Sequence, residues 1–186
     1  MATKSRRTVL LGAGATVLAL AACNNSVSGN GGNEIDARVD ATLNALTTEV
    51  PETNDLVSKA AGILVMPVIT EAGFGIGGSF GRGALLVEGL TVDYYSAAQA
   101  SIGFQIGAQQ FSHVLFFMTP EALADFRTSP GWVAGANIEY AFTDRGESLL
   151  ADTTTVPNPV VGVVFGQTGI RAGATIDGTK YSRIIP

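Results

Sequence analysis

The first hydrophobic pattern after residue 33 has the period of an α-helix. Five apolar residues recur at intervals of three or four, with polar residues between them: Ile35, Val39, Leu43, Leu46 and Val50. Pro51 ends this pattern, and a second short helix is expected over residues 52–61. The polar face of the first helix carries four acids against Arg38 alone. Because helices that lie on membranes usually carry basic polar faces, we expect this pair to pack on a sheet of its own domain.

Beyond residue 62 the pattern changes to short apolar runs and period-two alternation, which are typical of strands. The expected strands are 63–66, 73–81, 84–87, 91–95, 101–109, 111–118, 132–142, 160–165, 170–176 and 181–185. Glycine alternates with larger residues over 73–81, which indicates close backbone approach or sharp bending of the sheet. We expect one hairpin about Glu88–Gly89 and another at Asp177–Gly178, where both turn residues would need positive φ.

A third helix is predicted in the middle of these strands. Thr119 is a favourable N-cap, Pro120 suits the first helical position, and Glu121 faces the positive end of the helix dipole. The helix should run to about Arg127. The predicted fold is therefore α+β: a strongly bent antiparallel sheet or half-barrel, with short N-terminal helices and one mid-chain helix.

The first 22 residues have the organisation of a secretory signal peptide. Arg6–Arg7 precede an apolar stretch over 9–22, which is shorter than the roughly 20 residues of a membrane-spanning helix. Arg6–Arg7 also resemble a twin-arginine export signal. The run that ends Leu20-Ala21-Ala22-Cys23 resembles the lipobox of bacterial lipoproteins. This resemblance implies cleavage before Cys23 and attachment of acyl chains, such as palmitate, to that residue.

Residues 23–33 then form the lipidated cysteine and a polar, glycine-rich tether, and residues 34–186 form one domain. Loss of Lys4, Arg6 and Arg7 with the signal leaves 8 basic against 16 acidic residues, a net charge of −8. This balance disfavours nucleic acid and anionic lipid as partners. With Cys23 consumed and His113 the only histidine, Cys/His metal sites are disfavoured too, and no cofactor is expected.

Two short segments match the sequence motifs of known enzyme classes. Gly73, Gly75 and Gly78 have the spacing of the dinucleotide fingerprint, but the residues that follow have strand rather than helix character. Gly77–Gly81 matches Gly-x-Ser-x-Gly around Ser79, and Asp93 and His113 follow in the order of a serine-hydrolase triad. That motif also needs a helix directly after it. We therefore expect no enzymatic activity, and keep a serine esterase using Ser79 as the least favoured alternative.

Nine aromatic residues fall mostly at alternating strand positions: Phe74, Phe80, Phe104, Phe111, Phe116, Phe117, Trp132, Phe142 and Phe165. Most would be core residues. A sheet lined in this way could also leave an apolar cleft for an acyl chain, and the pattern alone leaves both readings open.

From about Ala60 to Ile184 the chain resembles the SYLF-domain family. The matching stretches, in family order, are Ala60–Pro67, Ala72–Gly78, Tyr94–Ser96, Gly103–Gln109, Phe126–Arg127 with Gly131–Trp132, and Gly178–Lys180. The resemblance implies a non-enzymatic lipid-binding module; eukaryotic members bind phosphoinositides and actin filaments, and bacterial members are often exported lipoproteins. This chain lacks the basic N-terminal helix of the eukaryotic pattern.

These observations predict a lipoprotein of the bacterial cell envelope, anchored to a membrane through acylated Cys23 and facing the periplasm or the cell exterior. Its domain would bind an acyl chain or phospholipid by apolar contact, with residues that the sequence does not identify. The alternative is a scaffolding module that binds another envelope protein through a sheet edge or exposed aromatics.

Overall fold

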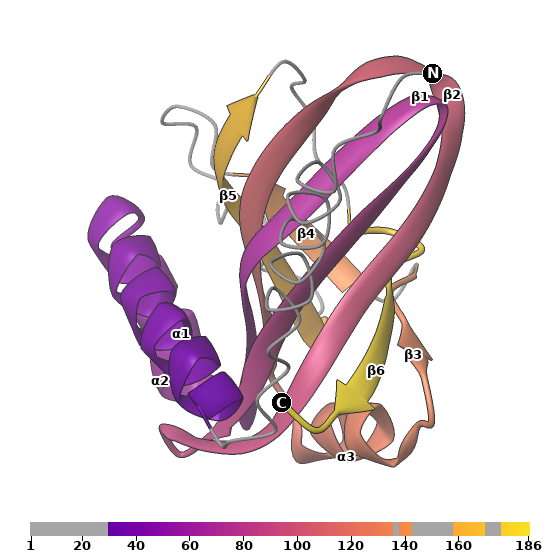
Figure 1. Ribbon diagram of the computed structural model, residues 1–186. Helices are drawn as coiled ribbons and strands as arrows, with labels where there is room; N and C mark the ends of the chain where they lie inside the picture. The colour runs from indigo at the N-terminus through magenta and orange to yellow at the C-terminus, as the bar shows by residue number, and fades with distance from the viewer. Residues whose placement is uncertain (1–29, 136–137, 143–157, 170–175) are drawn as a thin grey trace, which may run out of the picture.

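The computed structural model describes residues 30–135, 138–142, 158–169 and 176–186, and within them it confirms the α+β fold. The helices are α1 (Asn30–Glu49), α2 (Thr53–Lys59) and α3 (Pro120–Thr128), and the strands are β1 (Gly62–Val87), β2 (Leu90–Phe117), β3 (Trp132–Val133), β4 (Ile138–Phe142), β5 (Val160–Gly169) and β6 (Lys180–Ile184). Figure 1 shows the sheet strongly curled, with α1 and α2 beside it and α3 at one end. The expected signal peptide, Cys23 and nearly all of the expected strand 170–176 lie outside the described residues.

Two very long strands replace the six shorter ones expected before residue 119. Strands β1 and β2 pair antiparallel from the turn at Glu88–Gly89 to the pair Gly62–Phe117. Both turn residues have positive φ, 52° and 77°, as a tight hairpin requires. The interruptions in the pattern are register shifts inside the ladder, such as the one between Met66 and Ile69 that includes Pro67. Proline has no N–H to donate to a ladder, so it is accommodated at such irregularities.

Strand β1 folds back on itself. A Cβ atom placed on Gly83 would lie 2.0 Å from the carbonyl oxygen of Val65, and one on Gly81 would lie 2.5 Å from that of Val68. No side chain fits at these separations, so glycine is required where the two halves of β1 meet. The close backbone approach expected from the glycine-rich stretch is thereby confirmed.

The far edge of β2 is shared by two strands. Residues 94–98 pair with β6, and residues 109–117 pair with β5. Strand β3 flanks β6, and β4 flanks β5, giving the order β3-β6-β2-β5-β4. The pair β4–β5 is parallel, while every other described strand pair is antiparallel.

Two sequence predictions were wrong in this region. The single strand expected over 132–142 is two strands, β3 and β4, at opposite edges of the sheet. The turn at Asp177–Gly178 has positive φ only at Gly178, at 77°. The two-residue turn itself forms, because Thr179 N–H donates to the Ile176 carbonyl at 3.0 Å. Gly178 N–H also donates to the Ala134 carbonyl at 2.8 Å, which holds the residue after β3 in place.

The apolar runs are continuous because their strands are buried on both faces. Alternate residues point into an inner core: Leu64, Met66, Ile69, Leu85, Tyr95, Ala97, Phe111, Leu115, Phe117, Phe126, Ala134, Val160, Val164, Ile176 and Tyr181. Their neighbours form an outer core beneath α1 and α2: Val39, Leu46, Ile63, Val65, Ala84, Leu86, Val114, Phe116, Val161, Val163 and Phe165. The sheet is therefore the middle layer between a curled interior and a helical cover.

Helix α1 is fixed to the sheet by polar contacts as well as by Val39 and Leu46. Asp36 accepts hydrogen bonds from the hydroxyls of Thr91 and Tyr94, both at 2.9 Å. This confirms that α1 packs on its own sheet. It begins at Asn30, so residues 30–33, which the sequence analysis assigned to the tether, are helical. None of the helices in the described residues is long and apolar enough to cross a membrane.

Helix α3 begins as its sequence predicts. The Thr119 side chain accepts a hydrogen bond from Ala122 N–H at 3.2 Å, and Pro120 occupies the first turn. Its buried face presents Phe126, whose ring centroid lies 4.7 Å from those of Tyr95 and Phe117. Helix α3 therefore closes the end of the inner core that lies near the β1–β2 turn.

Candidate functional site

The three residues of the hydrolase-like motif lie at separate positions of the β1–β2 ladder. Ser79 is paired with Gln99, Asp93 with Leu85, and His113 with Met66. The Asp93 carboxylate faces Arg127 and Arg183, at 3.2 Å and 3.3 Å, rather than the histidine. Ser79 lies inside a strand, with no helix after it. The geometry of a nucleophile elbow is therefore missing.

His113 is a core residue. Its Nε2 lies 2.7 Å from the hydroxyl of Tyr181, and its side chain is 1% exposed. Burial lowers the pKa of the imidazole to about 3, so the ring is neutral at physiological pH. Among the described residues its Nδ1 has no hydrogen-bond partner. A base in this position has neither an orienting carboxylate nor access to a substrate.

The dinucleotide-like glycines also lie within β1. Strand β1 continues through Gly73, Gly75 and Gly78 to Val87, and a hairpin follows. A pyrophosphate needs the N–H groups at the start of a helix, which this segment does not provide.

The curled interior of the sheet is filled by side chains. Leu64, Leu115 and Phe117 are fully buried in the inner core. Trp132 packs against it, with its ring centroid 5.4 Å from that of Phe126. Of the two readings that the aromatic pattern left open, core packing is correct for the described interior aromatics. Among the described residues, a pocket lies outside this core.

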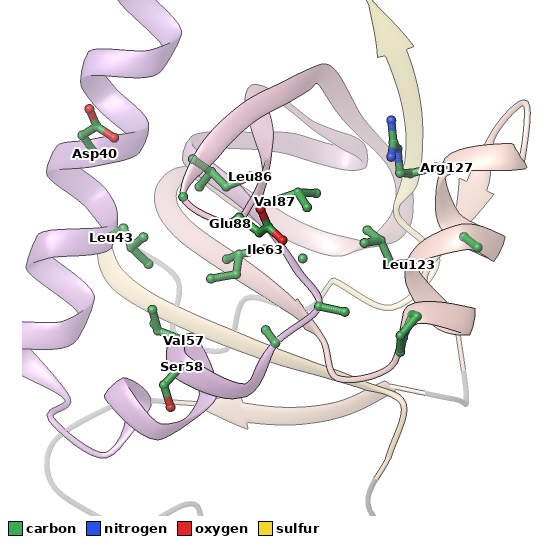
Figure 2. Close-up of a pocket in the computed structure, with 16 residues that line it drawn as sticks. Asp40, Leu43, Val57, Ser58, Ile63, Leu86, Val87, Glu88, Leu123 and Arg127 are labelled. Atoms are coloured by element: carbon green, nitrogen blue, oxygen red, sulfur yellow. The ribbon is translucent and has the colours of Figure 1, made fainter.

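A pocket of about 780 Å³ lies at the end of the sheet that carries the β1–β2 turn. Figure 2 shows it between the helical pair α1 and α2 on one side and α3 on the other, with the start and end of β1 as its floor. The residues that line it are Asp40, Leu43, Val57, Ser58, Ala60, Ala61, Gly62, Ile63, Leu86, Val87, Glu88, Gly89, Pro120, Leu123, Ala124 and Arg127. We call this pocket the end groove.

The lining of the end groove divides into two kinds of residue. Side chains of Leu43, Ile63 and Leu123 point into it in Figure 2, where they form an apolar surface. Its ionisable lining residues are Asp40, Glu88 and Arg127. A hydrophobic concavity with a few polar groups suits an aliphatic ligand that has one polar end, and its volume is within the range of ligand pockets.

Arg127 is held at the groove by its neighbours. Its Nε lies 3.2 Å from the Asp93 carboxylate, and its backbone carbonyl accepts a hydrogen bond from Arg183 at 3.1 Å. Because the Arg127 side chain remains 42% exposed, its other N–H groups can reach an incoming carboxylate or phosphate.

Sequence reasoning did not find the end groove. Its residues come from α1, α2, both ends of β1 and α3, and no local motif connects these segments. The one usable signal was the pair of amphipathic helices, because Leu43 and Val57 on their apolar faces line the groove. Within the described residues, no cluster of three or more acidic, histidine or cysteine side chains could hold a metal ion.

Comparison with known proteins agrees with the resemblance found in the sequence. Residues 98–183 match the model of a protein family described as "Ysc84: Las17-binding protein actin regulator", which is the SYLF family. The matched segment runs from the middle of β2 through α3 and β5 into β6. No curated protein matches the chain. Residues 98–183 are thus similar to the SYLF family, whose domains are lipid-binding or actin-regulator-related modules.

Proposed function

We propose that this protein is a membrane-anchored lipoprotein of the bacterial envelope whose domain binds an acyl chain in the end groove. The ligand would be a fatty acid such as palmitate or one chain of a phospholipid. The observation that carries this proposal is the end groove, an apolar pocket of about 780 Å³ outside a filled core. A module with a packed interior and an open apolar pocket can hold a ligand without unfolding.

Several features support binding without catalysis. Ser79, Asp93 and His113 are not assembled, and His113 is buried and neutral. The polar side chains that line the end groove are one arginine, already paired with Asp93, two acids, and Ser58, whose hydroxyl donates to the Asp55 carbonyl at 2.9 Å. Such groups can orient a polar headgroup, whereas a hydrolase needs a nucleophile beside its base.

Membrane attachment rests on the sequence before α1. The Leu20-Ala21-Ala22-Cys23 run supports acylation of Cys23, and each buried methylene of its chains contributes about 0.8 kcal/mol. More than one chain is needed for stable anchoring. We expect intact mass spectrometry of protein from its native membrane to show acyl chains on Cys23. A Cys23→Ser chain should be released by mild extraction, and an unmodified Cys23 in the native protein would contradict the anchor.

Binding in the end groove can be tested by filling it. Ala124 is an exposed residue of α3 that lines the groove, so Ala124→Trp should occupy ligand space without disturbing the core. The matched control is Ala37→Trp, an exposed position of α1 outside the groove lining. We expect native mass spectrometry to show bound fatty acid or phospholipid in the parent and in the control. Ala124→Trp should lower the affinity about tenfold or more, equivalent to about 1.4 kcal/mol.

The same experiment can contradict the proposal. If the parent chain has the mass of the free protein and takes up no lipid from vesicles, the end groove does not bind acyl chains. If both tryptophan variants retain lipid equally, the lipid binds elsewhere on the domain.

A further inference from the structure

The end of the sheet opposite α3 has a different surface. We call it the tip and define it as residues 72–78 of β1 with their strand partners 100–108 of β2. In Figure 1 it is the bend of the two long strands at the top, away from α3 and the C-terminus at the bottom. Phe74 is 78% exposed there and Ile76 is 76% exposed. Large apolar side chains this exposed, two residues apart, indicate a contact surface.

The tip carries no formal charge. From residue 72 to 81 of β1, and from 94 to 117 of β2, the sequence has no Asp, Glu, Lys or Arg. The nearest acid in β1, Glu71, is buried and accepts a hydrogen bond from Gln109 Nε2 at 2.7 Å. A surface without charges avoids the largest desolvation cost when it enters an apolar environment.

The backbone of the tip is paired only in part, because the register shifts between Phe74 and Ile76 and leaves Gly75 and residues 103–105 without a ladder partner. Gly73 is opposite Gly107, Phe74 opposite Ile106, and Ile76 opposite Ile102. Ladder pairing satisfies N–H and C=O groups that would otherwise require water. The groups without a ladder partner still need water, so the tip suits the hydrated interfacial region of a bilayer and not its hydrocarbon core.

The length of the segment between Cys23 and α1 indicates which surface the tip would contact. Helix α1 starts at Asn30, and a Cβ atom on Gly32 would lie 2.9 Å from the Tyr94 hydroxyl, which places this start beside β2. From Tyr94 to Ile102, the strand partner of Ile76, β2 advances eight residues, or about 26 Å. The seven residues from Cys23 to the start of α1 span at most about 25 Å. An anchor on Cys23 and the tip reach the same membrane plane when this segment is nearly extended and the domain is tilted toward the membrane.

We propose that the tip is a second membrane contact, in which Phe74 and Ile76 insert into the interfacial region of the bilayer that holds acylated Cys23. The inference rests on the proposed anchor and is separate from ligand binding in the end groove. The contact is apolar, so it suits zwitterionic phospholipid. The net charge of −8 after signal removal opposes docking on an anionic surface. Anchored by both Cys23 and the tip, the domain would hold the end groove away from the membrane, facing the aqueous phase.

The first test places a fluorescent label on the tip. In the acylated full chain Cys23 is consumed, so Phe74→Cys supplies the only free thiol for an environment-sensitive dye. The control is Thr128→Cys, an exposed position of α3 at the other end of the domain. We expect phosphatidylcholine vesicles to shift the dye at 74 to shorter wavelength, and nitroxide-labelled lipids to quench it. The dye at 128 should remain water-like and unquenched. Both dyes staying in water while the chain remains on the vesicles would overturn the proposal.

The second test removes the anchor and changes the tip. The full chain carrying Cys23→Ser should bind phosphatidylcholine vesicles weakly, and adding Phe74→Ser with Ile76→Ser should reduce that partition about tenfold. The control pair is Leu90→Ser with Ile185→Ser, because those side chains are 70% and 99% exposed near the opposite end. Control and parent should bind equally, in low and in high salt.

The outcomes separate the tip from the proposed function. If Cys23 proves not to be acylated but the tip variants still lose vesicle binding, the tip contact stands and the anchor fails. If the tip and control pairs reduce binding equally, the tip proposal is wrong whatever the end groove binds. If the dye at 74 shifts with protein concentration in the absence of vesicles, the tip joins copies of this chain instead, which also overturns it.

Discussion

The two ends of the curled β1–β2 sheet have opposite surroundings: the end near α3 contains both ends of the ladder, and the tip is the middle of the ladder. At the end near α3, the strands are buried on both faces, and charged residues such as Asp93 and Arg127 surround them. At the tip, the strands carry no charge and expose Phe74 and Ile76. One continuous ladder thus serves two purposes: its ends stabilise the domain and form a pocket, and its middle presents an apolar surface. Backbone pairing alone does not tell which end of the sheet is which.

The largest difference should appear when a methyl group is added to a glycine at each end. Gly83→Ala would place Cβ 2.0 Å from the Val65 carbonyl oxygen, so β1 could not keep its fold-back. We expect it to destabilise the domain by about 4 kcal/mol or more, or to prevent folding. At the tip, Gly78→Ala meets the Gln99 carbonyl at 3.1 Å and should cost about 1 kcal/mol or less. Urea unfolding followed by circular dichroism measures both, and equal losses would contradict the comparison.

Truncating one phenylalanine at each end should give the next largest contrast. Phe126 is fully buried beneath α3, so Phe126→Ala should lower the free energy of unfolding by about 3–5 kcal/mol. Phe74→Ala removes a side chain that is 78% exposed and should change stability by no more than about 0.5 kcal/mol. The midpoints of urea unfolding at equal slope give the two values. A large loss at Phe74 would mean that the tip is part of the core.

Low pH should lower the free energy of unfolding through protonation of His113. Its pKa is lowered to about 3 in the folded state by burial and returns to about 6.5 on unfolding. Below pH 6.5 the unfolded chain therefore binds a proton that the folded chain does not bind until about pH 3. Stability falls as pH falls through that window, by up to about 3 kcal/mol between pH 7 and pH 4.

The variant His113→Phe isolates this contribution. It cannot titrate, so the loss of stability between pH 7 and pH 4 should be smaller than in the parent chain, although carboxylates contribute equally to both. Chemical unfolding at the two pH values measures the difference. An unchanged pH dependence would mean that His113 takes up its proton in the folded state near its ordinary pKa.

The smallest effect is expected at Ser79, between the two ends. The residue is buried in β1 opposite Gln99, with no base beside it, and we expect no hydrolysis of a short acyl ester by the parent chain. Ser79→Ala should then leave both the ester assay and vesicle binding unchanged. Turnover that disappears in Ser79→Ala would instead support the esterase alternative.

The sequence predicted most elements because local signals agreed with tertiary packing. Thr119 and Pro120 marked the start of α3, and Pro51 marked the end of the first helical pattern. Period-two alternation located nearly every described strand. It did not show that the six strands expected before residue 119 join into two long strands, β1 and β2. Proline and glycine usually mark turns, but Pro67 and the glycines of β1 lie at bulges and at a fold-back.

The missed features depend on contacts between distant segments. The alternation over residues 132–142 predicts one strand, but β3 pairs with β6 and β4 pairs with β5. The sequence of this segment does not indicate either partner. The end groove joins residues as distant as Asp40 and Arg127. Periodicity reports which face of an element is apolar; it does not report where two elements leave a gap.

The pairing of β2 has a consequence for the order of folding. Pairing of β1 with β2 can start at the residues beside the Glu88–Gly89 turn and extend away from it. Each new pair then closes only a short additional loop. Strand β6 pairs with residues 94–98 of β2, far away in sequence, and this step carries a much larger entropic cost. The hairpin can form early during synthesis, whereas the sheet can be completed only after residues 180–184 have left the ribosome. Until then β2 keeps part of one edge unpaired, and export in the folded state would have to wait for that last strand.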